Sequence, residues 1–409
     1  MLADTHLRSL AVLFYCNAKN YLCGKNSKAL KIAVNTRLLL KDKIEGIGWF
    51  KYENLSRITR QHPEHQFYFL FDRPFSEEFI FADNVTPVVV NPPARHPVLY
   101  YLWFEHAIPR ALKKINADLF LSPDGYLSLS SKVPSMNVFH DLSFEHFPQD
   151  LPYLERKYYR YFFPKYAKKA IRIATVSDFS KRDIVEKYGV DENKIDLVYS
   201  GTNDSFKPVG ENVKKRIRTE FTQGSPYFLF MGSLHPRKNL ARLFTAFDQF
   251  KQTDSSGTKL LIVGMKKWWT GNIKVAFDNM KYQDDVILPG RVELQTLNEI
   301  VASALAITYV SYLEGFGLPI LEGFHSDTPV ITSNVTSMPE VAGDAALLVN
   351  PFSTNSIASA MTRIANEPAL RNELIEKGRI QKEKFSWQKT SELLWGSIEK
   401  TMEEIGKKV

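Results

Sequence analysis

Short apolar runs alternate with segments of helical length along almost the whole chain. Each run is short enough for one buried strand, and repeated strand-then-helix order produces a parallel sheet covered by helices on both faces. The first series of expected strands covers 31–35, 66–71, 85–90, 118–121, 136–139, 171–176 and 194–199. The second covers 227–231, 260–263, 286–288, 304–310, 329–332 and 346–349.

The alternation pauses once, at the turn-rich segment 200–208. A chain of 409 residues is also too long for one ordinary domain. We therefore expect an α/β fold with two Rossmann-like domains facing a central cleft, 31–205 and 206–385, and a helix at 386–409 that packs back toward the first domain. Ligands of such sheets bind at the carboxyl ends of the strands.

Residues 1–30 have no clear period and contain both cysteines, Cys16 and Cys23. We interpret this segment as an upstream extension produced by a misread start, and a loosely attached N-terminal arm is the alternative. Two cysteines exclude a disulfide framework and a four-cysteine zinc site, and they favour a reducing compartment.

The net charge of +8 favours anionic partners, but the basic residues are scattered, which argues against a nucleic-acid stripe. Apolar runs are too short to span a membrane. We expect a cytoplasmic protein. Two segments rich in rings and cations, 98–110 and 153–169, suit peripheral contact with the anionic inner face of a membrane. Inter-helix core with exposed lysines is the alternative for both.

The segment GSLHPRKN, residues 232–239, stands between an expected strand and an expected helix that begins at Lys238. Gly232 permits a tight turn, and the start of a helix offers free N–H groups and partial positive charge. Arg237 and Lys238 add two cations at that point, which indicates a pyrophosphate site. A solvated basic helix start is the simpler alternative.

A second motif, EGFGLPILE, runs from Glu314 to Glu322 after an expected strand. Gly315 and Gly317 allow close backbone approach to a ligand, and Pro319 suits the first turn of a helix, where we also expect Glu322. Paired hydrolytic carboxylates lie roughly 5–9.5 Å apart, whereas eight residues of helix span about 12 Å. The two acids therefore suit separate roles, one at sugar hydroxyls and one at a ribose diol, although Glu322 alone would pass for an ordinary N-terminal acid.

Together these motifs resemble the retaining glycosyltransferases of family 4, which have the two-domain GT-B architecture. Segments 334–344, 200–208 and 288–292 add to the resemblance, which covers about residues 31 to 400 and is more specific in the second half. It implies that Arg237 and Lys238 bind the donor diphosphate, that Glu314 contacts the donor sugar, and that Glu322 holds the ribose. The other implied donor contacts are the phosphate turn at Gly232, the base neighbours Arg291 and Val292, and the backbone of Gly315, Phe316 and Gly317.

In the first half, His140 follows an expected strand and resembles the family histidine that reaches the transferred sugar. A histidine that merely caps a strand is the alternative. The EGIG segment with Gly46 and Gly48 resembles the family glycine loop beside the donor phosphates.

We therefore expect a retaining hexosyltransferase of cell-surface polysaccharide synthesis, with catalytic Glu314, His140, Arg237 and Lys238. GDP-mannose is the first expected donor, and a glycan or a polyprenyl-linked molecule is the expected acceptor. No Asp-x-Asp pair follows a strand in a phosphate loop, so we expect neither metal nor cofactor. Two alternatives stay open: a nucleotide-sugar epimerase of GT-B fold and a non-catalytic nucleotide-sugar-binding module.

Overall fold

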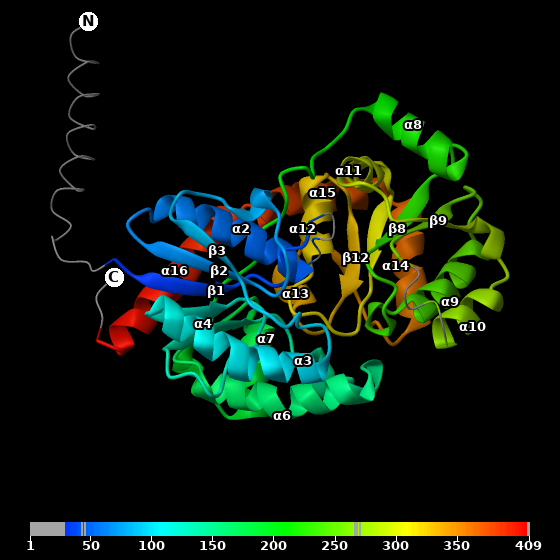
Figure 1. Cartoon of the computed structure of the whole chain (residues 1–409). Helices are drawn as coiled ribbons and strands as arrows, with labels where there is room; N and C mark the ends of the chain where they lie inside the picture. The colour runs from blue at the N-terminus through cyan, green and yellow to red at the C-terminus, as the bar shows by residue number, and fades with distance from the viewer. Residues whose placement is uncertain (1–28, 42–43, 45, 266–268, 270, 407–409) are drawn as a thin grey trace, which may run out of the picture.

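The computed structural model describes residues 29–41, 44, 46–265, 269 and 271–406. Nearly all of the proposed 1–30 extension lies outside the described residues, as do both cysteines. The described chain forms two parallel sheets that stand side by side (Figure 1).

The first sheet has seven parallel strands in the order β3-β2-β1-β4-β5-β6-β7. Its strands are β1 Lys31–Asn35, β2 Gln66–Phe71, β3 Val85–Val89, β4 Leu119–Ser122, β5 Ser135–Phe139, β6 Ile173–Thr175 and β7 Ile195–Leu197. Successive residues of a strand face opposite sides. Ile32 and Val34 join one buried cluster, and Ala33 joins another on the opposite face.

The second sheet has six parallel strands in the order β10-β9-β8-β11-β12-β13. They are β8 Tyr227–Met231, β9 Lys259–Val263, β10 Val286–Gly290, β11 Ala306–Tyr309, β12 Val330–Ser333 and β13 Leu347–Val349. Every expected strand is present, with ends that differ by up to two residues. The α/β class and the pair of Rossmann-like sheets are confirmed.

The helices cover both faces of each sheet. Those of the first part are α2 Gly46–Gln61, α3 Pro97–Leu102, α4 Ile108–Ile115, α5 Ser143–His146, α6 Tyr153–Lys169 and α7 Asp178–Tyr188. Those that follow are α8 Glu211–Thr222, α9 Leu240–Lys251, α10 Gly271–Asp278, α11 Leu294–Ser303, α12 Leu318–His325, α13 Met338–Ala342, α14 Thr354–Asn366, α15 Pro368–Lys382 and α16 Trp387–Glu404.

Helices α3 and α4 are joined by a π-helical segment, Trp103–Ala107, which breaks a helical stretch over 97–115. Pro109 explains the break, because proline has no N–H to give to the carbonyl four residues back, and its ring would clash with that carbonyl. That carbonyl belongs to Glu105, and the hydroxyl of Ser130 donates to it instead at 2.6 Å.

Each sheet has a point from which the chain winds outward in both directions: between β1 and β4 in the first, and between β8 and β11 in the second. Ligands of parallel α/β sheets bind in the crevice at the carboxyl ends of the strands beside such a point. The segments that follow β8 and β11 are therefore the first places to look for a site.

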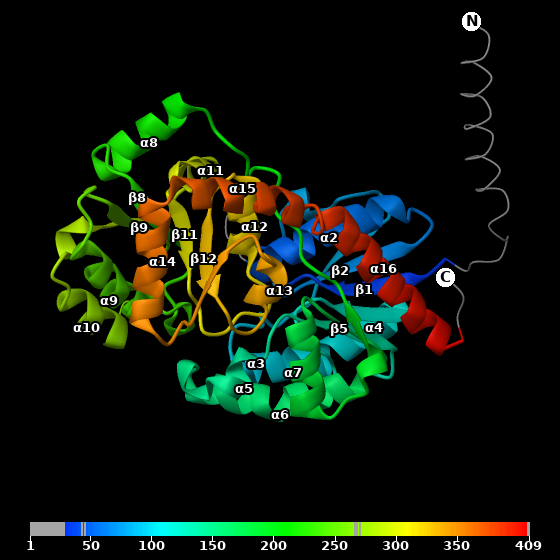
Figure 2. The same ribbon diagram turned by 180° about the vertical axis from the view of Figure 1, so that it is seen from behind.

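Helix α16 crosses from the second sheet to the first and lies along α2 (Figures 1 and 2). The ring of Trp395 stacks on His62, with centroids 3.6 Å apart. The Thr390 hydroxyl donates to the Tyr199 carbonyl at 2.6 Å. One buried apolar cluster includes residues of both sheets and of α16, so the two halves share a core. No helix of the described residues has both the length and the apolar character to cross a bilayer.

Gly201 is where the start of α16 meets the first half of the chain. A Cβ atom at Gly201 would lie 2.2 Å from the backbone nitrogen of Trp387, a backbone contact that cannot yield cheaply. We expect Gly201→Ala to lower the free energy of unfolding by about 1–3 kcal/mol, the usual cost of overpacking. Urea denaturation measures the change.

Gly396→Ala serves as the matched control within α16. Its Cβ would meet nothing within 4 Å, and alanine is favoured over glycine inside a helix by roughly 0.5–1 kcal/mol. The control should therefore be slightly more stable than the wild type. Equal stability of Gly201→Ala and the wild type would contradict the tight contact.

A candidate active site between the two sheets

The segment after β8 forms a compact turn that carries the two predicted cations. Gly232 has φ of +125°, a conformation that favours glycine. A 3₁₀ turn, Pro236–Lys238, follows, and the His235 side chain accepts the backbone N–H of Arg237 at 3.3 Å. Asn239, with φ of +65°, separates this turn from α9. The expected helix start at Lys238 is therefore wrong by two residues.

The Glu314 carboxylate lies between Arg237 and Lys238. Its Oε1 is 2.7 Å from Lys238 Nζ, and its other oxygen accepts from Arg237 Nη1. Burial alone would raise the pKa of Glu314, but the two cations lower it to about 2. The sequence predicts that these three residues lie together, and the structure brings them together as a buried cluster with two positive charges and one negative charge.

Tyr309, the last residue of β11, lies beneath this cluster. The Lys238 ammonium donates to its hydroxyl at 2.7 Å and lies 4.6 Å from the centre of its ring. Burial lowers the pKa of Lys238, and the Glu314 carboxylate offsets this only in part. Sequence reasoning missed Tyr309. A hydroxyl-bearing ring at the end of an otherwise apolar strand was the available signal.

The loop from Glu314 to Gly317 is fixed from within the second half of the chain. The Ser337 hydroxyl lies 2.9 Å from the Glu314 carbonyl oxygen and 2.8 Å from that of Phe316. The Phe316 ring packs on Phe385, at 5.7 Å between centroids, so only its backbone faces outward. Gly317, with φ of +113°, precedes α12. Ser337 is a second residue that sequence reasoning missed.

Glu322 is the fifth residue of α12, so its expected place in the first turn is wrong. Pro319 does stand in that turn, as predicted. Burial raises the pKa of Glu322 to about 7, and the charge of Lys238 offsets part of this rise. Within the described residues, no hydrogen bond is made to its carboxylate. Glu322 is thus an acid near Lys238 with free acceptor oxygens.

His140, directly after β5, brings the first half of the chain to this loop. A Cβ atom at Gly315 would lie 1.7 Å from the His140 carbonyl oxygen, so the two backbones meet and only glycine fits. The close approach that Gly315 allows is therefore made by His140. The His140 Nε2 atom lies 3.0 Å from the Pro123 carbonyl oxygen, and burial lowers the pKa of the ring. A neutral imidazole that donates from Nε2 has Nδ1 as its acceptor.

The remaining predicted residues lie farther from the cluster. Arg291, which is exposed, and Val292 follow β10. Both residues therefore lie at the same carboxyl edge of the sheet as Gly232, which follows β8. Strand β9 lies between β10 and β8. Gly46 and Gly48 lie in the first turn of α2 rather than in a loop before it.

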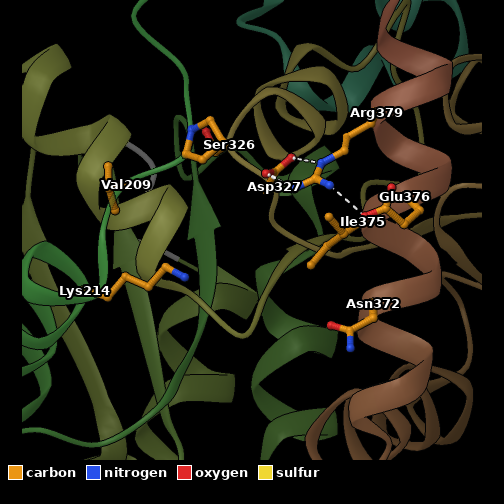
Figure 3. Close-up of a pocket in the computed structure, with 9 residues that line it drawn as sticks. Val209, Lys214, Ser326, Asp327, Asn372, Ile375, Glu376 and Arg379 are labelled. Carbon is orange, nitrogen blue, oxygen red and sulfur yellow. Dashed lines mark hydrogen bonds and ion pairs between the residues drawn. The ribbon is translucent and has the colours of Figure 1, made fainter.

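A pocket of about 250 Å³ lies at the other end of α12 (Figure 3). It includes Asp327 and Arg379, whose ion pair measures 2.6 Å. Gly317 stands at the opposite end of the helix, so about 12 Å of helix separates this pocket from the Glu314 loop.

His62, Glu64 and His65 are the residues of the described chain grouped closely enough for a metal ion, with ligand atoms within 4.8 Å of one another. The Nδ1 atom of His65 accepts the Leu30 N–H at 3.3 Å. Its Nε2 therefore carries the proton of the neutral ring and makes a poor ligand. This group stands beside Trp395 of α16, away from the Glu314 cluster.

A larger hollow of about 970 Å³ lies between α3 and α6. Residues of both segments rich in rings and cations, 98–110 and 153–169, line this hollow. Its lining includes Val98, Tyr101, Tyr153, Leu154 and Tyr161, all of them exposed, together with Arg156, Lys157 and Arg160.

Comparisons with known proteins agree with this arrangement. Residues 52–206 match the family described as Glycosyltransferase Family 4, and residues 212–381 match Glycosyl transferases group 1. O-antigen chain mannosyltransferase B of Escherichia coli is 27% identical over 286 residues, which are 68% of this chain and 73% of that protein. The O-antigen chain mannosyltransferase RfbU of Salmonella typhimurium is 28% identical over 56% of this chain and 60% of its own length.

Solved structures share the fold. WaaG, a glycosyltransferase involved in lipopolysaccharide biosynthesis, superposes with a TM-score of 0.70 at 15% identity and covers 88% of this chain and 97% of its own. Anabaena HepE in complex with UDP and glucose gives 0.71 at 14% identity, with 90% and 99% covered. With two family models along most of its length and a GT-B architecture, the chain belongs to the group 1, family 4 glycosyltransferases and is similar to bacterial O-antigen mannosyltransferases.

Proposed function

We propose that this glycosyltransferase moves mannose from GDP-mannose to a glycan or polyprenyl-linked acceptor, with retention of the anomeric configuration. The observation that carries the proposal is the buried cluster of Arg237, Lys238 and Glu314, against which the His140 backbone closes. The choice of mannose draws on two similar proteins, O-antigen chain mannosyltransferase B and RfbU.

Charge explains what the cluster would do. Breaking the bond between the sugar and the nucleoside diphosphate leaves negative charge on the pyrophosphate. Arg237 and Lys238 are held in place before the donor arrives, so they stabilise that charge without reorganising. They also supply the positive charge that a divalent cation would otherwise bring, which supports a metal-independent reaction.

The electrostatics of Glu314 suit a retaining reaction that forms no covalent intermediate. A carboxylate whose pKa is about 2 is a stabilised anion and a weak nucleophile. We therefore infer that Glu314 accepts hydrogen bonds from sugar hydroxyls and forms no covalent intermediate. The acceptor hydroxyl then attacks from the face that the diphosphate leaves, with His140 beside the transferred sugar.

The hollow between α3 and α6 suits the acceptor side of the reaction. Its exposed rings and aliphatic side chains match lipid, and its three cations match anionic headgroups or the phosphates of a lipid-linked acceptor. Pro148 lines the hollow, and Asp150, two residues on, accepts the Tyr312 hydroxyl at 3.1 Å. Tyr312 precedes Glu314 by two residues, so a short series of neighbouring residues links the hollow to the Glu314 loop. We infer peripheral contact with an anionic membrane through this surface.

The central prediction concerns transfer itself. The wild type should transfer mannose from GDP-mannose to a lipid-linked acceptor extract in the presence of EDTA. Arg237→Ala and Glu314→Gln should each reduce the rate by about a hundredfold or more, the usual effect of removing a charge-stabilising group. Product analysis should show an acceptor-dependent α-mannoside.

Arg363→Ala is the matched control, because Arg363 is an exposed residue of α14 paired with Glu367. Near-normal transfer in Arg237→Ala would contradict the assignment of the site. Sugar released without acceptor would favour an epimerase, and binding without turnover would favour a binding module. Faster transfer from a UDP-sugar than from GDP-mannose would identify the UDP-sugar as the donor.

A second prediction concerns the pH dependence of donor binding. Ribose hydroxyls donate stronger hydrogen bonds to an ionised carboxylate than to a protonated carboxyl, and Glu322 ionises with a pKa of about 7. The Kd for GDP-mannose should therefore rise by up to tenfold for each pH unit below about 7 and level off above it. Calorimetry from pH 5.5 to 8.5 measures this, and the doubly esterified diphosphate of GDP-mannose keeps a constant charge over that range.

Glu322→Gln isolates the effect, since the amide does not titrate. It should bind more weakly than the wild type at pH 8 and lose the slope below pH 7. A slope that persists in Glu322→Gln would assign the titration to another group.

A third prediction tests the membrane surface. The triple variant R156Q/K157Q/R160Q should bind vesicles containing anionic lipid about a hundredfold more weakly, at about 1 kcal/mol for each lost cation. The control K214Q/K215Q/R216Q removes three cations from α8, which lies with the second sheet. Co-sedimentation with phosphatidylglycerol and with neutral vesicles measures both. Wild-type binding that ignores anionic lipid would contradict the contact.

A further inference from the structure

Helix α7 belongs to the first sheet, but its first turn is capped by an acid from the second half of the chain. The Glu340 carboxylate of α13 accepts the backbone N–H of Asp178 at 2.8 Å and that of Phe179 at 3.3 Å. The first N–H groups of a helix have no partner within it, and that end carries partial positive charge. A carboxylate seated on two such groups makes charge-assisted hydrogen bonds.

The same turn touches both loops of the candidate site. The Ser180 hydroxyl lies 3.3 Å from the carbonyl oxygen of His140 and 3.3 Å from that of Gly315. The Ser177 side chain caps the turn by accepting the Ser180 N–H. The start of α7 is therefore the place where the His140 loop, the Glu314 loop and α13 meet.

The segment that carries Glu340 also holds the Glu314 loop. Ser337, directly before α13, lies against the carbonyl oxygens of Glu314 and Phe316. Glu340, three residues later, reaches across to α7. A shift of Glu340 would therefore move Ser337 and, through it, the backbone of Glu314.

We propose that Glu340 is a positioning residue for sugar transfer, which acts by docking on the start of α7 and so fixing His140 against the Glu314 loop. It does not touch the donor. Separation of the two halves would leave its carboxylate in water and the α7 N–H groups uncapped, so the contact forms only when the site is assembled. This inference rests on the proposed transfer reaction.

The test is a double-mutant cycle that removes the contact from either side. Glu340→Gln removes the charge. Asp178→Pro removes one donor N–H, and the backbone tolerates it, because Asp178 is the first residue of α7 and Ser177 before it is extended, with ψ of 159°. Asp178→Ala is the reference for Asp178→Pro, since it loses the same side chain but keeps the N–H.

We expect Glu340→Gln to lower kcat by about tenfold or more, and Asp178→Pro to do the same relative to Asp178→Ala. The GDP-mannose Kd should change less than twofold, because the residues proposed above for the diphosphate and the ribose, Arg237, Lys238 and Glu322, are in the second half of the chain. The combination Asp178→Pro with Glu340→Gln should be no slower than the slower single variant. Asp344→Asn, an exposed acid four residues after Glu340, is the control and should keep the wild-type kcat.

A wild-type kcat in Glu340→Gln would overturn the proposal, as would effects that multiply in the double variant. Solution scattering gives a readout that does not need turnover. With GDP-mannose bound, Glu340→Gln should have a larger radius of gyration than the wild type and Asp344→Asn. If the wild type transfers no sugar, the proposed reaction is wrong. Scattering then decides by itself whether Glu340 holds the two halves together. Equal radii of gyration for the wild type and Glu340→Gln would show that it does not.

Discussion

The Glu314 carboxylate held by Arg237 and Lys238 is the interaction on which the candidate site depends. Burying one charge is costly unless it is paired, and removing one partner of a buried pair leaves the other uncompensated. Here one acid serves two cations, and the Tyr309 hydroxyl accepts from one of them. The cluster therefore keeps a net positive charge in a protected place, which is the condition that the proposed diphosphate binding requires.

Both sheets place a cluster of charged side chains near the carboxyl edge, and the two clusters differ. Each sheet has a crevice at its carboxyl edge, between β1 and β4 or between β8 and β11. In the second sheet the crevice carries the Arg237 turn and the Glu314 loop. In the first, Asp124 pairs with Arg37 and Lys51, each at 3.0 Å, and all three side chains are almost fully buried within the wall. The first cluster is thus closed off from solvent, whereas part of the Arg237 side chain in the second cluster stays exposed.

The strands could be predicted from sequence because parallel strands buried on both faces are short, continuous apolar runs. The grouping of Arg237, Lys238 and Glu314 could also be predicted, since the segments after β8 and β11 meet at one edge. The starts of helices were harder to predict from the sequence. His235 and Asn239 shift the start of α9, and neither residue belongs to a periodic pattern. The partner of Gly315 could not be predicted, because His140 lies far away in sequence and only the packed chain shows that the two backbones touch.

The crossing of α16 has a consequence for how the protein is made. The apolar side of α2 packs with Trp387 and Trp395, which come from a helix synthesised after the entire second sheet. A ribosome adds about 5–20 residues per second, so that side of α2 waits roughly 15–65 seconds for its cover. The final packing of that side of α2 is therefore reached only after residues 387–404 have left the exit tunnel.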